Sequence, residues 1–260
     1  MSDLPRYLEV TAALEAMIHQ MGPNALLPTE DQLAGRFDVS RVTLRRALGV
    51  LERSGYISRL RGRGTIVSPP KAIRRLVPFC PIEQDFRDQG LRLETRVLTY
   101  EAAMRAAEPV CGHLGLPEGA LVGHLVMIRM VEDRIICHDQ RYFPPAIAAQ
   151  FDPDLLASRP LPDILEAAAG KRITASDVET EIVSSPADVA KMLGITPRSL
   201  IVVNTFTEFL ETGDPLNLGV MSYRIDRVRF KSTVSLPGAS PAPGPSGVRG
   251  SRSEGRPKRR

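Results

Sequence analysis

Residues 27–67 read LPTEDQLAGRFDVSRVTLRRALGVLERSGYISRLRGRGTIV, a stretch in which several local signals follow one another. Thr29 and Gln32 have the spacing of a capping box, in which the Thr29 hydroxyl accepts a free backbone amide and Gln32 reaches back to the backbone of Thr29. A helix is therefore expected to begin at Thr29. After a short turn, Ser40 is placed to cap a second helix.

The second helix should have one buried and one exposed face. Apolar residues at helical spacing fall in one stripe: Leu44, Ala47, Leu48 and Leu51. The opposite face carries Val42, Arg45, Arg46, Gly49 and Arg53. A helix divided in this way can be held rigidly from behind while its cationic side meets phosphates and base edges in a DNA major groove. Gly55 supplies the left-handed residue expected to end this helix.

Two short strands, 56–60 and 65–67, are predicted after the second helix. Residues 61–64, Arg-Gly-Arg-Gly, join them, and the glycines permit a tight turn that places two cations at its tip. Such a wing can lie along the DNA backbone or enter the minor groove. Ahead of the pair, apolar residues at helical spacing within 10–21 predict a first helix that covers the back of the other two.

This order of elements resembles the winged helix-turn-helix domain of the GntR family of bacterial transcription regulators, over about residues 6–68. The resemblance implies operator contacts from Ser40, Arg41, Val42, Arg45, Arg61 and Gly62. The predicted DNA-binding residues also include Thr29, Thr43, Arg46 and Arg63. The family usually has an arginine where this chain has Asp31, so we expect one contact to be missing and the operator to depart from the commonest family consensus.

The alternative interpretation of this region is a solvated basic face on an ordinary three-helix unit. Arginine-rich helices are common, but they rarely occur together with this cap, stop and wing. For single residues other roles stay open: Arg53 could pair with Glu52, and Arg46 is expected to touch phosphate rather than a base.

Charge is distributed unevenly along the 260 residues. Residues 1–75 carry 12 Lys and Arg against 7 Asp and Glu, or +5; residues 76–235 carry 16 against 22, or −6; residues 236–260 carry 6 against 1, again +5. DNA attracts a basic surface through counterion release, so the N-terminal part is the one suited to bind it. The Pro-, Gly-, Ser- and Arg-rich segment 236–260 is expected to be a disordered tail, either inert or adding non-specific DNA affinity.

The sequence contains no apolar run long enough to span a membrane and no signal-peptide pattern, which predicts a cytoplasmic protein. Three cysteines are an odd number without paired spacing, so no disulfide framework is expected. Histidines lie near two of them, but Cys111-x-His113 and Cys137-His138 lack a usual ligand spacing, and we predict no metal site. No cofactor is predicted.

The sequence Ser-Pro-Pro-Lys at 68–71 breaks secondary structure. Residues 69–78 are therefore predicted to be a linker between a first domain at 1–68 and a second domain at 79–235. Strands are predicted at 121–131, 135–143, 172–183, 200–210 and 216–223. Helices are predicted near 79–89, 109–114, 162–169 and 186–193. Long strands interrupted by helices predict an α+β fold built on an antiparallel sheet.

This second region resembles the UTRA effector-binding domain of the HutC-type branch of the GntR family, whose fold is similar to chorismate lyase. The matching segments are Gly90 in FRDQG, HLGL at 113–116, Arg129, YFP at 142–144, ADVAKMLG at 187–194 and YRIDR at 223–227. The resemblance implies a homodimer with a small-molecule site beside the sheet. Together the two resemblances predict a ligand-responsive regulator, most often a repressor in this family, that binds an inverted-repeat operator as a dimer.

Family members that bind small acids or phosphorylated sugars use an arginine pair on one strand, a carboxylate on the next, and a glutamate and a tyrosine near the end. Those places fall here on Met127, Arg129, Asp139, Asn217 and Tyr223. The predicted effector-binding residues are Gly90, Arg129, Asp139, Asn217 and Tyr223. Arg129 could clamp an anionic group, which predicts an anionic metabolite, and the two departures argue for a ligand other than the best-known sugar phosphates.

Alternatives remain at each level. Arg129 could be a surface strand residue paired with Asp139, and Tyr223 could be a core ring with its hydroxyl satisfied. The whole chain could be an effector-independent DNA-binding protein whose second domain serves only to dimerise. It could also be an enzyme of chorismate-lyase-like fold, although no nucleophile with its base and no phosphate-binding glycine loop is apparent.

Overall fold

The computed structural model describes residues 5–60, 62, 64–75 and 81–232. Its N-terminal domain contains three helices and a two-stranded hairpin: α1 (Arg6–Met21), α2 (Glu30–Phe37), α3 (Arg41–Arg53), β1 (Ile57–Leu60) and β2 (Gly64–Val67). The wing-tip arginines Arg61 and Arg63 lie outside the described residues, as does the basic tail 236–260. We refer to residues 5–67 as the head and to residues 72–232 as the body.

The helix boundaries of the head follow the predicted local signals. Thr29 accepts a hydrogen bond from the amide of Gln32 at 3.3 Å and donates its own amide to Gln32 Oε1 at 2.9 Å, so both halves of the capping box are present. Ser40 accepts from the amide of Thr43 at 3.2 Å and caps α3. Gly55, with φ of +78°, ends α3 in the left-handed region, as predicted.

The apolar stripe of α3 forms the centre of the head core. Leu44, Ala47, Leu48 and Leu51 are each no more than 1 % exposed. They pack with α1, whose buried residues Val10, Leu14 and Ile18 cover the back of the helix pair. Each buried leucine contributes about 2 kcal/mol through the hydrophobic effect, so α3 is held firmly from behind.

The body is built on a six-stranded antiparallel sheet with the strand order β4-β5-β6-β9-β8-β7. Its strands are β4 (Leu93–Arg105), β5 (Leu121–Val131), β6 (Arg134–Phe143), β7 (Ile173–Ser184), β8 (Leu200–Leu210) and β9 (Pro215–Arg224). The predicted strands match five of these. Strand β4 was not predicted, because its side chains alternate weakly between buried and exposed and it lies at the sheet edge.

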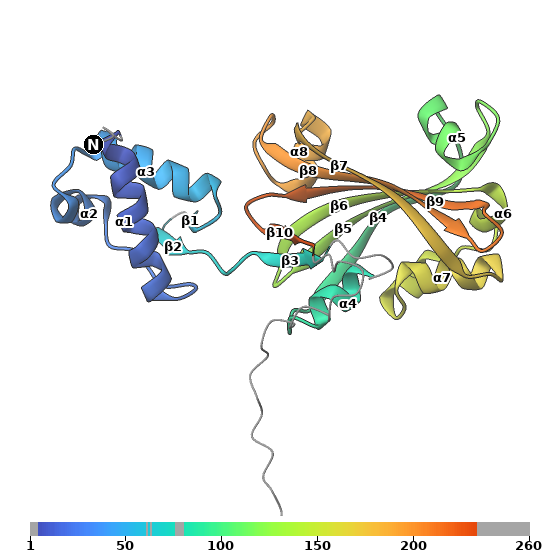
Figure 1. Ribbon diagram of the computed structural model, residues 1–260, viewed down its shortest axis with the longest axis horizontal. Coiled ribbons are helices and arrows are strands. Elements are labelled where there is room, and N and C mark those ends of the chain that lie inside the picture. The colour runs from blue at the N-terminus through green and yellow to red at the C-terminus, as the bar shows by residue number, and fades with distance from the viewer. Residues whose placement is uncertain (1–4, 61, 63, 76–80, 233–260) are drawn as a thin grey trace, which may run out of the picture.

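Short helices cover both faces of the sheet (Figure 1). They are α4 (Ile82–Arg87), α5 (Glu108–Leu114), α6 (Pro145–Ala148), α7 (Leu161–Ala169) and α8 (Ala187–Leu193), with a 3-10 turn η1 at Pro153–Ala157. Helices α4, α6 and α7 lie on one face, which we call the lower face, and α5 and α8 lie on the other. Two apolar clusters lie on the lower face, one where α4 packs on the sheet and one where α7 packs on it. Polar side chains lie between these two clusters.

The predicted linker is partly structured. Residues Ala72–Arg75 form strand β3, which pairs in parallel with β10 (Val228–Lys231) at the end of the body. Residues 68–71 alone join β2 to β3 without a helix or strand. The expectation that 69–78 lacks secondary structure is therefore wrong for 72–75, because pairing with a strand more than 150 residues away leaves no local signal. Figure 1 shows β3 beside β10.

Within the described part of the chain, no helix has both the length and the apolar composition needed to cross a membrane.

Candidate DNA-binding surface and effector site

The exposed face of α3 carries the residues expected to meet DNA. Val42 is 79 % exposed, and the side chains of Arg41 and Arg45 are 66 % and 63 % exposed. Thr43 lies beside them, with its hydroxyl 3.0 Å from that of Ser40. Gly62 in the wing has φ of +77°, consistent with the tight turn expected there. The head thus presents an apolar tip and two cations on a rigid helix.

Both cations are held by carboxylates from the start of α2. Arg45 Nε lies 2.7 Å from Glu30 Oε2, and Arg41 Nε lies 2.8 Å from Asp31 Oδ1. Asp31 is the residue at which the chain departs from the family pattern, and its carboxylate forms an ion pair with Arg41. Ion pairs at such exposed positions contribute about 0–1 kcal/mol, so a phosphate or base edge can replace them at little cost.

The remaining arginines of this surface have their own supports. The Arg46 guanidinium lies over the ring of Tyr7, 3.9 Å from its centre, which fixes it beside α1. Glu52, considered as a partner of Arg53, instead pairs with Arg59 of β1 at 3.3 Å. Helix α3 and strand β1 of the wing are thereby joined by an ion pair.

In the body, strand register brings four of the predicted effector residues to the lower face, and Asn217, the fourth, is described below. Arg129 of β5 and Tyr223 of β9 are both aligned with Cys137 of β6, the strand between them. Asp139, two residues further along β6, is aligned with Met127 of β5. All three are buried, with exposures of 1 %, 0 % and 0 %. Arg129 is therefore not a surface residue, although its expected pairing with Asp139 is present.

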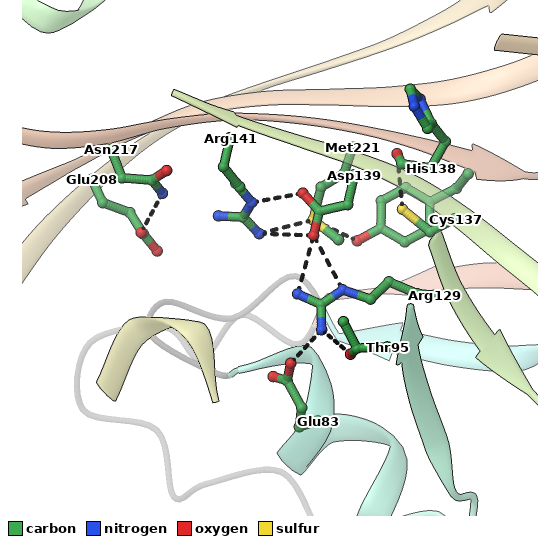
Figure 2. A network of polar contacts seen from close by, with 11 residues as sticks. Glu83, Thr95, Arg129, Cys137, His138, Asp139, Arg141, Glu208, Asn217 and Met221 are labelled. Atoms are coloured by element: carbon green, nitrogen blue, oxygen red, sulfur yellow. Dashed lines mark hydrogen bonds and ion pairs between the residues drawn. The ribbon is translucent and has the colours of Figure 1, made fainter. Parts of the chain in front are cut away.

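Arg129 is held by three side chains (Figure 2). Its Nε and Nη2 each donate to Asp139 Oδ2 at 3.2 Å, and its Nη1 donates to Glu83 Oε1 of α4 and to Thr95 Oγ1 of β4, both at 2.6 Å. Burial opposes the charge of Arg129, but Glu83 and Asp139 outweigh it and raise the pKa of the guanidinium above its ordinary value. Arg129 is a permanent cation, and each of its three guanidinium nitrogens already donates to a side chain.

A second buried arginine, Arg141, shares the carboxylate of Asp139. Arg141 Nε donates to Asp139 Oδ1 at 2.6 Å and Nη2 to Oδ2 at 3.3 Å. The guanidinium lies over the ring of Phe206, 4.6 Å from its centre. Arg141 was not among the predicted residues, although it follows Asp139 by two positions and the period of a strand places both on one face.

Asn217 and Glu208 form a pair beside Arg141. The two residues lie opposite each other on β9 and β8, and Asn217 Nδ2 donates to Glu208 Oε2 at 2.8 Å. The sequence comparison with the family had suggested that a carboxylate was lost at Asn217. Glu208, on the neighbouring strand, supplies a carboxylate beside Asn217. This becomes evident only from the register of β8 and β9.

Of the other two predicted residues, Tyr223 meets this polar group only through Met221, whose Sδ also lies 3.6 Å from Arg141 Nη2, and Gly90 lies apart from it. Tyr223 sits in the apolar cluster under α4, with its hydroxyl 3.2 Å from Met221 Sδ and its ring edge-on to Phe230, an environment that fits a core residue. Burial raises the pKa of its hydroxyl. Gly90 occupies an exposed turn after α4 with φ of +72°. No hydrogen bond or ion pair joins Gly90 to the polar group in the described structure.

The cysteines and histidines of the body are dispersed. Cys111 and Cys137 are buried free thiols, His124 stacks on Tyr142, and His113 Nδ1 lies 3.1 Å from Thr207 Oγ1. Within the described ranges, no three His, Cys, Asp or Glu side chains gather in a way that could hold a metal ion. Cys80 lies outside those ranges.

Two family models match the chain in the order of its two domains. The model for bacterial regulatory proteins of the gntR family matches residues 6–67, and the UTRA domain model matches residues 88–229. The chain belongs to the GntR family of transcription regulators, in its HutC-type branch. It is therefore a DNA-binding transcription regulator with an effector-binding domain, and the enzyme alternative is set aside.

Similar proteins cover nearly the whole regulator. The HTH-type transcriptional repressor NagR of Bacillus subtilis is 26 % identical over 88 % of this chain and 94 % of its own length. The probable transcriptional regulator PhnF of Escherichia coli is 30 % identical over 86 % and 93 %. The crystal structure of PhnF from Mycobacterium smegmatis matches with a TM-score of 0.58 and 23 % identity over 87 % of this chain and 99 % of that one, which supports the fold.

Proposed function

We propose that this regulator is a repressor that binds an inverted-repeat operator as a homodimer and responds to a small metabolite bearing an anionic group. The observation that carries the proposal is the exposed arginine face of α3. On the opposite side of this helix lies the apolar stripe, whose residues are each no more than 1 % exposed. We assign base contacts to Arg41, Val42 and Arg45, and backbone contacts to Arg46 and the wing. The repressor role is supported by the relative NagR, which is named a repressor.

Dimerisation is supported by the outer strand β7. Its twelve residues form one edge of the sheet, and Val178 and Ile182, which point to the same side, are 51 % and 70 % exposed. An exposed strand edge with apolar side chains favours pairing with another chain. In a two-fold symmetric dimer the two heads would contact half-sites about one helical turn apart.

The anionic component of the effector is supported by the buried arginines. Arg129 and Arg141 converge on Asp139 from neighbouring strands, and paired guanidinium groups at a buried site suit a carboxylate. Such a ligand would compete with Glu83 or Asp139 for these donors. The family's effector-binding domain is the part of the chain in which this group lies.

Helix α4 offers a physical connection from this polar group to the head. It carries Glu83, which binds Arg129, and Asp85, which is 0 % exposed. Asp85 accepts from Arg74 at 3.0 Å and from the backbone of Arg75 at 2.6 Å, and both lie in β3. A ligand that displaced Glu83 would shift α4, and β3 with it, and thereby change the population of head arrangements that fit the operator.

The test is selection of bound sequences from random duplex by the full-length protein, followed by titration of the selected site. An enriched inverted repeat, bound by two chains, is the expected outcome. Enrichment of no sequence, or of a single half-site bound by one chain, would contradict the proposal. Light scattering of the free protein gives the number of chains independently of DNA.

A further inference from the structure

The polar group on the lower face of the body has unfilled hydrogen-bonding positions of two kinds. Arg141 uses Nε and Nη2 on Asp139, while Nη1 has no hydrogen-bond partner among the described residues. Asn217 is 0 % exposed, and its Oδ1 is buried without a partner. Because Nδ2 of Asn217 donates to a carboxylate, the orientation of this amide is determined by its surroundings and the free atom is an acceptor.

Asn204 adds a second free acceptor. It lies on β8 two residues before Phe206, is 5 % exposed, and has a buried Oδ1 without a partner. A buried polar atom without a partner costs about 1–3 kcal/mol, so such atoms are rare unless a ligand or water satisfies them. The group thus offers one cationic donor and two neutral acceptors to a molecule that enters it.

The arginine is held in place by a specific packing arrangement. Gly219 of β9 lies opposite Arg141, and a Cβ built at Gly219 would collide with the ring of Phe206. The missing side chain leaves room for the outer end of the Phe206 ring, and the Arg141 guanidinium lies over this ring, 4.6 Å from its centre. Phe206 and Glu208 are only partly buried, so the group is reachable from solvent beside them.

The charges of the group exclude a strongly anionic ligand as the best fit. Two cations, Arg129 and Arg141, face three carboxylates, those of Glu83, Asp139 and Glu208. Burial disfavours the charged form of Arg141, while Asp139 and, to a smaller extent, Glu208 raise the pKa of its guanidinium. Adding a dianion would leave its charge uncompensated in a buried place, whereas a ligand with one charge of each sign adds none.

We propose that Arg141 and the Glu208–Asn217 pair are the recognition residues of the effector site and that the effector is a small zwitterion. Its anionic group binds Nη1 of Arg141, and its ammonium group binds Glu208 and the free oxygen of Asn217. Figure 2 shows Arg141 lying between Asp139 and the Glu208–Asn217 pair. The inference rests on the proposed effector response and names the ligand class for that same site.

The two ends of the ligand should be several ångströms apart. Asn217 lies two residues along β9 from Gly219, the partner of Arg141, which corresponds to about 7 Å along an antiparallel strand. The probes are therefore ω-aminocarboxylates of increasing length, from glycine to 6-aminohexanoate. Each is compared with the plain carboxylate and the plain alkylammonium ion of the same chain length, and the melting temperature of the full-length protein is measured with each at millimolar concentration.

At least one aminocarboxylate is expected to raise the melting temperature more than both of its monofunctional counterparts. In Glu208→Gln this aminocarboxylate should raise the melting temperature no more than the plain carboxylate does. In Arg141→Met it should raise the melting temperature no more than the alkylammonium ion does. Glu211→Gln, an exposed carboxylate beyond the end of β8, is the matched control and should retain the full preference. If Arg141→Met fails to fold, Glu208→Gln alone tests the inference. Glu208 is partly exposed, and its replacement leaves Arg129 and Arg141 paired with Asp139, so this variant is expected to fold.

Equal shifts with plain carboxylates, no shift with any probe, or a preference that survives Glu208→Gln would overturn the inference. Operator binding by the same preparations is measured in parallel without probe, and the control Glu211→Gln should bind the operator as the unmodified protein does. Intact operator binding without a zwitterion preference contradicts only the ligand class. Absence of sequence-specific binding in the unmodified protein contradicts the proposed function itself.

Discussion

The head and the body of this regulator both pair arginine with carboxylate, but in opposite surroundings. In the head, the exposed side chains of Arg41 and Arg45 are bound at 2.8 and 2.7 Å by Asp31, which is exposed, and by Glu30, which is partly buried. In the body, Arg129 and Arg141 are bound to a carboxylate that is 0 % exposed. Exposed pairs are weak and exchange readily, whereas breaking a buried pair leaves an uncompensated charge. The same chemistry can therefore serve rapid exchange with DNA in one domain and a fixed arrangement in the other.

The largest effect is expected from Arg129→Ala, which tests the buried side of this comparison. Removing the guanidinium leaves Asp139 and Glu83 without their shared cation, and the free energy of unfolding should fall by about 3–5 kcal/mol. Urea denaturation of the full-length protein measures it. The control is Arg96→Ala, whose pair with Glu94 at 3.5 Å is exposed on both sides and should change stability by less than about 1 kcal/mol. Similar losses in the two variants would contradict the distinction.

Arg45→Ala tests the exposed side. It should leave the melting temperature almost unchanged but weaken operator binding by roughly 1–3 kcal/mol, if the guanidinium makes a bidentate contact with a base. Fluorescence anisotropy with the selected operator and with random duplex separates the two kinds of contact. Arg105→Ala, an exposed arginine of the body, is the control. An equal loss on both DNAs would assign Arg45 to the phosphates.

Thr29→Ala tests whether the head is stabilised by its helix cap as well as by its core. The substitution removes the acceptor for the Gln32 amide and should lower the stability of the head by about 1 kcal/mol. Amide hydrogen exchange in α2 measures this locally. Thr29→Ser preserves the hydroxyl and should behave like the parent, so an equal change in both variants would show that the methyl group matters instead.

The smallest effect is expected from Asp31→Ala, which frees Arg41 and removes a negative charge beside the DNA. Operator binding should tighten roughly two- to fivefold at low salt, with the gain shrinking as salt is raised. Titrations at several salt concentrations test this. Weaker binding would mean that Asp31 orients Arg41 for a base contact rather than neutralising it, which would make the pair a determinant of specificity.

The two regions also differ in how much of them could be predicted from sequence. The head is defined by local signals such as Thr29 with Gln32, the Ser40 cap and Gly55, each of which acts within one turn of helix, and the structure confirms them. In the body, the fold class was predicted correctly, but β3, β4 and β10 were missed. Strands β3 and β10 are four residues long each and pair with each other across more than 150 residues, whereas β4 lies at the sheet edge and alternates only weakly between buried and exposed side chains.

The candidate site was harder to predict for the same reason. Arg129 and Asp139 were identified through the family resemblance, and their contact follows from adjacent strands. Glu208 could not be connected to Asn217 without knowing how β8 and β9 align, and Glu83 reaches Arg129 from a helix 46 residues away. Arg141 could have been identified from its spacing to Asp139 alone.

The pairing of β3 with β10 has a consequence for the operator. Only residues 68–71 separate the end of β2 from the start of β3, so an extended chain between Val67 and Ala72 spans at most about 18 Å. The head is thus joined to the body by a short connection, and this connection limits how far the head can move from β3. If the regulator binds DNA as the proposed dimer, the paired sheet domains set the distance between the two half-sites, and inserting half a helical turn of DNA between them should abolish binding to one of them.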